Sequence, residues 1–187
     1  SKPDWVVLDC RKLEDYVKGH IPGAISLGKP CKKALRDGTS RVFPDSKRYE
    51  AILGKAGIGN NTHVILYGDL KTKALEDATV AFWVLEYIGH DKVHVLNGGL
   101  EAWTAACKKL DAAPTIKQPA TFKVNIVKSR YSSTDEVLKI AKGQAKDTQL
   151  IDARTKGEHE GDDIRALRGG RIPHTTIHAS HTDTFDK

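Results

Sequence analysis

The sequence predicts an α/β fold built on a doubly wound parallel sheet. Residues 5–8, 64–67 and 93–96 are apolar runs, broken only by His94 in the third, which is typical of strands covered on both faces. Between the second and third runs, apolar residues recur at helical spacing over residues 73–88. A strand, a helix and a strand in this order form a right-handed crossover between parallel strands.

Short polar residues and glycines mark the ends of the other predicted helices. Asp45 or Ser46 caps a helix that Gly57 ends, and Gly89 ends the helix of the crossover. The glycine pair at residues 98–99 opens a further helix. We therefore predict the order β-α-β-α-β-α-β-α for the elements in the first half of the chain.

A proline-containing segment separates this half from the rest. Residues 111–121 are rich in Ala, Pro, Lys and Gln, as linkers often are, and residues 122–127 then predict a new strand. Ser133 and Glu136 have the spacing of a capping box, which predicts the start of a helix. The next strand is predicted at residues 149–151.

The two halves share sequence, which indicates an internal duplication. Leu-Asp-Cys-Arg at residues 8–11 returns as Ile-Asp-Ala-Arg at residues 151–154. Gly-His-Ile-Pro-Gly-Ala-Ile at residues 19–25 returns as Gly-Arg-Ile-Pro-His-Thr-Thr at residues 170–176. The second copy carries extra residues at 162–169 and stops before the strands that would complete its sheet.

This comparison predicts a complete domain over residues 1–113, a linker over residues 114–121, and the amino-terminal part of a second domain over residues 122–187. A parallel sheet without its central strands leaves apolar surface and backbone groups open. We therefore expect the chain to be part of a longer protein, or to depend on a partner.

Composition narrows the classes of function. The 187 residues are 39% apolar and 29% charged, without an apolar stretch long enough to span a bilayer, so we expect no membrane partner. Thirty Lys and Arg against 24 Asp and Glu give a net charge of +6, spread along the chain, which suits a small anionic substrate better than a nucleic acid. Cys10, Cys31 and Cys107 form no metal-binding pattern or disulfide framework. Cytoplasmic and periplasmic locations both stay open.

The repeated segments, with Gly-His-x-x-x-His-Val-Leu-Asn-Gly-Gly-x-x-x-Trp at residues 89–103, resemble the two signature segments of rhodanese domains. The duplication is similar to that of tandem thiosulfate or mercaptopyruvate sulfurtransferases. The resemblance implies a rhodanese-like fold without a cofactor. It also implies that a loop cysteine takes sulfane sulfur from an anionic donor and passes the sulfur to a thiol or cyanide.

The resemblance places the reactive loop of the first copy at residues 67–73, where Asp69 stands at the position of the cysteine. A carboxylate cannot form a persulfide, so we expect the first copy to be silent and Asp69 to be a helix-capping or solvated loop acid. The cysteine of the second copy would lie beyond Lys187, so this chain holds no catalytic residue. The resemblance makes Arg154 a binding residue for the donor, whereas the alternative is an ion pair with Asp152 or Glu158.

Two competing interpretations stay open. The residues His174, His178, His181 and Asp183 have a spacing that could hold zinc. Their segment is predicted to form a strand and a loop, which would separate these side chains, so we expect no metal site. A non-catalytic rhodanese-like binding or regulatory module is the alternative to a sulfurtransferase.

Overall fold

The computed structural model describes residues 4–39, 41–145 and 147–184. The chain divides into two compact units, Ser1–Tyr131 and Ser132–Lys187. Within the described residues, no helix has both the length and the apolar character needed to cross a membrane.

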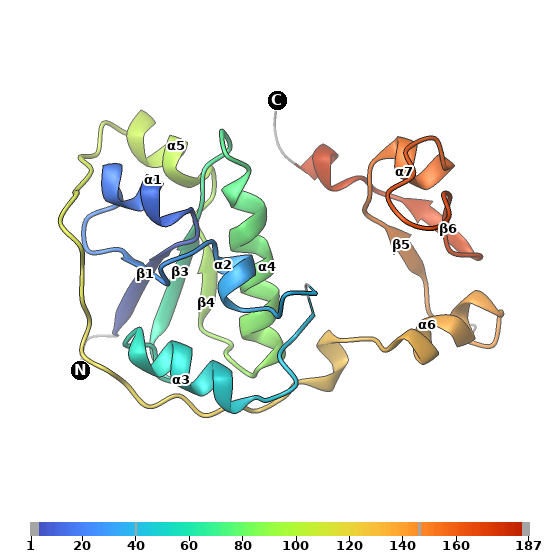
Figure 1. Cartoon of the computed structure of the whole chain (residues 1–187), viewed down its shortest axis with the longest axis horizontal. Helices are drawn as coiled ribbons and strands as arrows, with labels where there is room; N and C mark the ends of the chain where they lie inside the picture. Colours follow the sequence, from blue (N-terminus) through green and yellow to red (C-terminus); the bar gives the residue numbers. More distant parts are fainter. Residues whose placement is uncertain (1–3, 40, 146, 185–187) are drawn as a thin grey trace. The chain divides into compact units, whose positions relative to one another are not determined.

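The first unit is an α/β domain (Figure 1). Its elements in chain order are β1 (Trp5–Asp9), α1 (Leu13–Lys18), β2 (Ile25–Ser26), α2 (Cys31–Ala34), α3 (Lys47–Lys55), β3 (His63–Tyr67), α4 (Ala74–Tyr87), β4 (Val93–Val95), α5 (Gly99–Ala105) and the 3-10 turn η1 (Lys128–Arg130). The strands are parallel, in the order β2-β1-β3-β4. The predicted α/β fold and parallel sheet are confirmed, and the short helix α2 is an addition to the predicted order.

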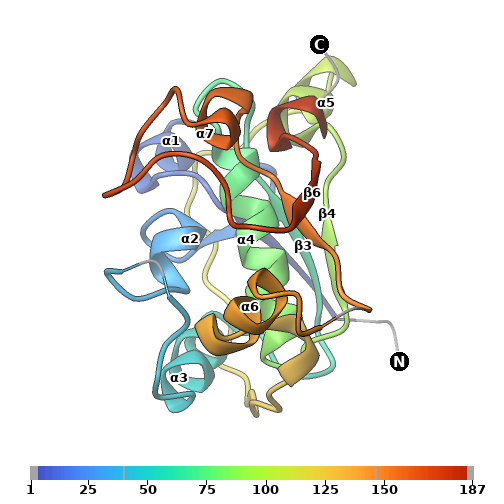
Figure 2. The same ribbon diagram turned by 90° about the vertical axis from the view of Figure 1, so that its right-hand side faces the viewer.

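Alternation along the strands explains why helices cover both faces of the sheet. Val6 and Leu8 of β1 point to one face with Val64 and Leu66 of β3, and all four are fully buried in the larger core, which also holds residues of α2, α3 and α4. Helix α4 lies across β3 and β4 (Figure 2). On the opposite face, Tyr67 packs with side chains of α5 in a smaller core.

Residues 122–127 do not form the predicted strand. Their backbone instead bonds to the carboxyl end of α4 and the residue after it, because Asn125 N–H donates to Ile88 O (3.0 Å) and Val127 N–H to Tyr87 O (2.8 Å). Phe122 is 2% exposed within the larger core. The apolar pattern that predicted a strand therefore reflects packing on the first unit.

The second unit is small, and after its first helix its elements follow the strand-helix-strand order in which the first unit begins. It contains α6 (Thr134–Ala141), β5 (Leu150–Asp152), α7 (Lys156–Glu160), β6 (Thr175–His178) and the 3-10 turn η2 (His181–Thr184). The predicted capping box is confirmed, since Ser133 and Glu136 bond to each other's backbone N–H at the start of α6. Strand β5 pairs with β6 in parallel, as β1 does with β2. The last residues of the expected second copy, 185–187, lie outside the described residues.

Candidate functional site

A buried ion pair fixes the carboxyl end of β1 in the first unit. Arg11 Nε donates to Asp9 Oδ1 (3.0 Å), and Arg11 Nη2 donates to Asp9 Oδ2 (2.6 Å) and to Gly19 O (2.7 Å). Asp9 is fully buried and Arg11 is 5% exposed. The guanidinium group therefore joins the strand end to the turn after α1 by charge-assisted hydrogen bonds.

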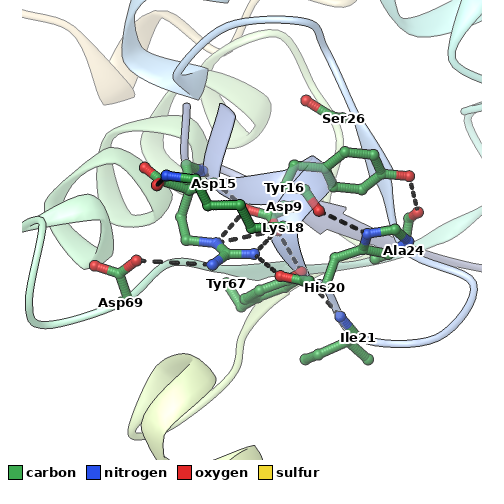
Figure 3. A network of polar contacts seen from close by, with 12 residues as sticks. Asp9, Asp15, Tyr16, Lys18, His20, Ile21, Ala24, Ser26, Tyr67 and Asp69 are labelled. Atoms are coloured by element: carbon green, nitrogen blue, oxygen red, sulfur yellow. Dashed lines mark hydrogen bonds and ion pairs between the residues drawn. The ribbon is translucent and has the colours of Figure 1, made fainter. Parts of the chain in front are cut away.

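Tyr67, at the end of β3, extends this network (Figure 3). Its hydroxyl donates to Asp9 Oδ2 and accepts from Ile21 N–H (3.2 Å). Burial and the neighbouring Asp9 carboxylate raise the pKa of Tyr67 well above its usual value. The phenol therefore stays protonated and acts as a fixed donor.

The loop between β3 and α4 is held by a carboxylate of its own. Asp69 Oδ1 accepts from Thr72 N–H (2.6 Å) and from Thr72 Oγ1 (2.5 Å). Asp69 Oδ2 lies 3.9 Å from Arg11 Nη1, the guanidinium nitrogen that donates to neither Asp9 nor Gly19. Asp69 is 7% exposed, so the expectation of a solvated acid is wrong: it is a buried loop acid that bonds within its own loop.

A second carboxylate takes two further amides of this loop. Glu101, in the first turn of α5, accepts from Leu70 N–H (2.9 Å) and Lys71 N–H (3.4 Å) through Oε1. The N–H groups of Leu70, Lys71 and Thr72, three in succession, therefore all donate to carboxylates of this chain. These amides would otherwise form a cradle for an anion ahead of α4. The first unit therefore has no thiol in the loop and no open amide cradle.

The second unit repeats the strand-end contacts. Arg154 Nε donates to Asp152 Oδ1 (2.9 Å), and Arg154 Nη2 donates to Asp152 Oδ2 (2.5 Å) and to Gly170 O (2.9 Å). The hydrogen bonds from Arg154 hold the pKa of Asp152 well below its usual value. The ion pair with Asp152 is thus present, while Glu158 caps α7 by accepting from Thr155 N–H (3.0 Å).

The two arginines differ in exposure. The Arg154 side chain is 44% exposed, against 5% for that of Arg11. Within the described residues, Nη1 of Arg154 has no hydrogen-bond or ion-pair partner, whereas Nη1 of Arg11 faces Asp69. A cavity of about 460 Å³ beside Arg154 is also lined by Arg168 and Arg171. Arg154 therefore has a free donor edge in a cationic surrounding.

Two cysteines lie close to the ion pair but belong to the larger core: Cys10 stands between Asp9 and Arg11, and Cys31 Sγ donates to Asp9 O (3.9 Å). Cys10 and Cys31 are fully buried, and burial raises the pKa of the Cys10 thiol well above its usual value. Cys107 is exposed and follows α5. A protonated, buried thiol is a poor nucleophile, so Cys10 is unsuited to carry sulfur.

Two histidines of the second unit bind backbone carbonyls. His178 Nε2 donates to Arg154 O (2.9 Å) and His181 Nδ1 donates to Ala153 O (2.8 Å). His159, which the sequence analysis did not single out, donates to Asp152 Oδ2 (3.0 Å) and stacks on His178. Within the described ranges, no group of three potential ligands has the placement of a metal site.

Glu101 and Tyr67 were also missed as site residues. Tyr67 ends an apolar run, where an aromatic residue looks like ordinary core. Glu101 lies far along the chain from the loop that it closes, so only the packing of α5 brings the two together. A glutamate in the first turn of a helix otherwise indicates no more than a favourable interaction with the helix dipole.

Comparison with known proteins identifies the class. The rhodanese-like domain family matches residues 1–106, and the chain therefore belongs to the rhodanese family. Thiosulfate sulfurtransferase of Cricetulus griseus is 31% identical over 167 residues, which cover 85% of this chain and 54% of that protein. The sulfur carrier protein TtuD of Thermus thermophilus is 29% identical, over 84% of this chain and 57% of that protein. The chain thus spans about half the length of the curated relatives that it matches.

Solved structures agree with the fold. An EanB variant, in complex with ergothioneine covalently linked with a persulfide cysteine, has a TM-score of 0.81 and 25% identity, over 96% of this chain and 45% of that chain. The anaerobic ergothioneine biosynthesis enzyme from Chlorobium limicola has a TM-score of 0.77 at 24% identity, over the same shares of the two chains.

Proposed function

We propose that this chain is the amino-terminal part of a rhodanese-type sulfurtransferase. The protein would move sulfane sulfur from thiosulfate or mercaptopyruvate to a thiol or cyanide, through a persulfide on a cysteine beyond residue 187. Membership of the rhodanese family and the names of the relatives support sulfur transfer as the general activity. The persulfide in the EanB complex supports the covalent route.

The proposed reaction has two covalent steps. The cysteine thiolate attacks the sulfane sulfur of thiosulfate, a new S–S bond forms as the old one breaks, and sulfite leaves with the electron pair. The acceptor thiolate or cyanide then attacks the outer sulfur of the persulfide, and the cysteine thiolate is released. In the first step an anionic donor approaches a thiolate, and in the second an anionic acceptor approaches the persulfide. Cationic side chains near the cysteine are therefore needed in both steps.

The free donor edge of Arg154 is the observation that carries this proposal. In the first unit, the equivalent edge of Arg11 faces the Asp69 carboxylate at 3.9 Å. The same contacts orient Arg154, so an anion held by a second reactive loop would take the place that Asp69 takes in the first. A guanidinium group suits this role because it stays charged and donates in a fixed direction.

One observation favours a non-catalytic role for the first unit considered alone. Asp69 and Glu101 occupy its loop amides, so this unit would serve as a binding or regulatory module within the proposed enzyme. This differs from the alternative in which the whole protein is a non-catalytic module.

A thiosulfate:cyanide assay separates the two functions. It compares the 187-residue chain with the natural gene product, including whatever coding sequence follows. We expect thiocyanate formation only by a product that contains a further cysteine, and intact mass should show a gain of one sulfur atom on that product. A natural product with such a cysteine and no turnover with thiosulfate or mercaptopyruvate would refute the enzymatic proposal.

A further inference from the structure

A concave basic surface lies in the first unit, apart from the site described above. We call it the basic pocket; it is a cavity of about 370 Å³ whose cationic lining consists of Lys29, Lys32, Lys33, Arg36 and Arg48. It shares no lining residue with the cavity around Arg11 and Asp69. Its chemistry is therefore independent of the proposed sulfur transfer.

The pocket wall also contains one acid, Asp37, against five cationic side chains. Asp37 Oδ1 accepts from Thr39 N–H (2.9 Å), Thr39 Oγ1 (2.7 Å) and Arg41 N–H (2.8 Å), so this oxygen is used to close its own loop. Asp77 of α4 pairs with one cation, Lys32, at 3.3 Å. Lys29 and Lys33 form no ion pair with any residue in the described part of the chain.

The fold holds these positive charges close together. Cys31 and Ala34 are buried and anchor α2, from which Lys32 and Lys33 extend. The guanidinium carbon of Arg48 lies 4.1 Å from the centre of the Phe43 ring, which keeps that side chain over the ring. Like charges gathered in a concave site repel one another, and a bound anion relieves this repulsion.

The lining also defines the kind of anion. The nearby rings of Phe43 and Tyr49 are buried, at 5% and 0% exposure, so they offer no surface on which bases of a single-stranded nucleic acid could stack. The lining residues are cationic or polar apart from Gly38, so an apolar ligand gains little. A compact ligand with several closely spaced charges fits best.

We propose that the basic pocket binds an oligophosphate group, meaning two or more linked phosphates. Such a group has the charge density to engage several Lys and Arg side chains within one small cavity. A free inorganic oligophosphate and the phosphate chain of a nucleotide share this chemistry.

Isothermal titration of the 187-residue chain with inorganic tripolyphosphate tests the proposal. The pocket variant combines Lys29→Gln, Lys33→Gln and Arg48→Gln. The matched control removes the same number of charges through Lys12→Gln, Lys108→Gln and Lys109→Gln, all on exposed residues. We expect the pocket variant to bind at least about tenfold more weakly and the control less than about twofold more weakly.

Equal weakening by both variants would overturn the proposal, as would absence of binding to the wild-type chain. A short polyglutamate peptide of matched charge that binds as tightly as tripolyphosphate would also overturn it, in favour of an acidic protein partner. ATP in place of tripolyphosphate distinguishes the two sources. Equal affinity assigns the site to the phosphate chain alone, and tighter ATP binding that the pocket variant abolishes assigns it to a nucleotide. Circular dichroism confirms that each variant is folded.

Discussion

Individual carboxylates decide what the loop of the first unit can do. Asp69 stands where the family resemblance places a cysteine, and it accepts two hydrogen bonds from Thr72 while facing Arg11. The substitution therefore replaces a nucleophile by a loop-closing acceptor. The sequence predicted an acid without a catalytic role here, but it did not predict the burial of Asp69. It could not predict Glu101 either, whose contact with the loop depends on how α5 packs.

The closing role of Asp69 predicts a loss of stability on truncation. Asp69→Ala should lower the free energy of unfolding by about 1–3 kcal/mol, because Thr72 and the buried Arg11 guanidinium lose an acceptor. Asp69→Asn keeps a side-chain oxygen and should cost less. Urea denaturation followed by circular dichroism measures both. Equal stability of wild type and Asp69→Ala would show that the loop does not need this carboxylate.

The donor edge of Arg154 predicts a defect in substrate binding, on the proposed function. In the complete gene product, Arg154→Gln should raise the KM for thiosulfate by about tenfold or more, the effect of one charge-assisted hydrogen bond. Arg11→Gln is the matched change in the first unit and should leave KM unaltered while lowering stability. Steady-state kinetics with unfolding curves for both variants separate the two roles, and an equal rise in KM for both would contradict the assignment.

At the level of elements, strong periodicity predicted well and weak patterns did not. The helix expected over residues 73–88 is α4, Ala74–Tyr87, because apolar spacing and a terminal glycine agree there. The strand expected over residues 122–127 is wrong, because Phe122 and Val124 pack on the larger core while the backbone of the segment bonds to the end of α4. A pattern of apolar residues indicates that one side of a segment is buried. It does not indicate which groups the backbone of that segment will hydrogen-bond to.

The contact after α4 predicts a strict need for glycine. Gly89 has φ +87°, and an added Cβ would lie 2.3 Å from Asn125 O. Gly89→Ala should therefore cost more than about 2 kcal/mol, since it combines a left-handed backbone with a collision. Gly28→Ala is the control, with φ +78° and nothing within 4 Å of the added atom. Thermal unfolding gives the loss of stability for each variant, and the difference between the two losses measures the collision alone. Equal losses would show that the added Cβ does not collide with Asn125.

At the level of the whole molecule, the boundary between the two compact units lies at a different residue from the predicted boundary between the two copies. The first compact unit ends at Tyr131, whereas the internal repeat led us to expect a linker at residues 114–121. Sequence similarity between the copies says nothing about residues that lie between the repeated segments. Those residues pack on the first unit through Phe122, so a contact of long sequence separation sets the extent of that unit.

This packing predicts where the chain can be cut. A chain of residues 1–131 should unfold cooperatively, with the stability of the first unit retained. A chain of residues 1–113 loses Phe122, which is 2% exposed, and should be less stable by about 3 kcal/mol or more. Guanidinium denaturation of both chains measures the difference. If both were equally stable, the segment after residue 113 would contribute nothing to the first unit.

Acid should destabilise the first unit through His90. Its ring is 1% exposed and packs edge-on against Phe122, and burial lowers its pKa. Below the usual histidine pKa of about 6.5, His90 binds a proton in the unfolded chain but stays neutral in the folded chain. Stability therefore falls as pH falls through this value. His90→Phe lacks this effect. Between about pH 7.5 and about pH 5.5, wild type should lose more stability than the variant in urea titrations. Parallel losses would exclude His90 as the cause.

The contacts between Asp9, Arg11 and Gly19 tie a strand to its neighbouring turn in a unit whose loop has no sulfur nucleophile. These contacts do not depend on the loop residue, so the Asp-x-Arg signature can serve folding in a domain that lacks a loop cysteine. Counting the signature in genomes would then overestimate the number of sulfurtransferases, and the loop residue is the better criterion for an active domain.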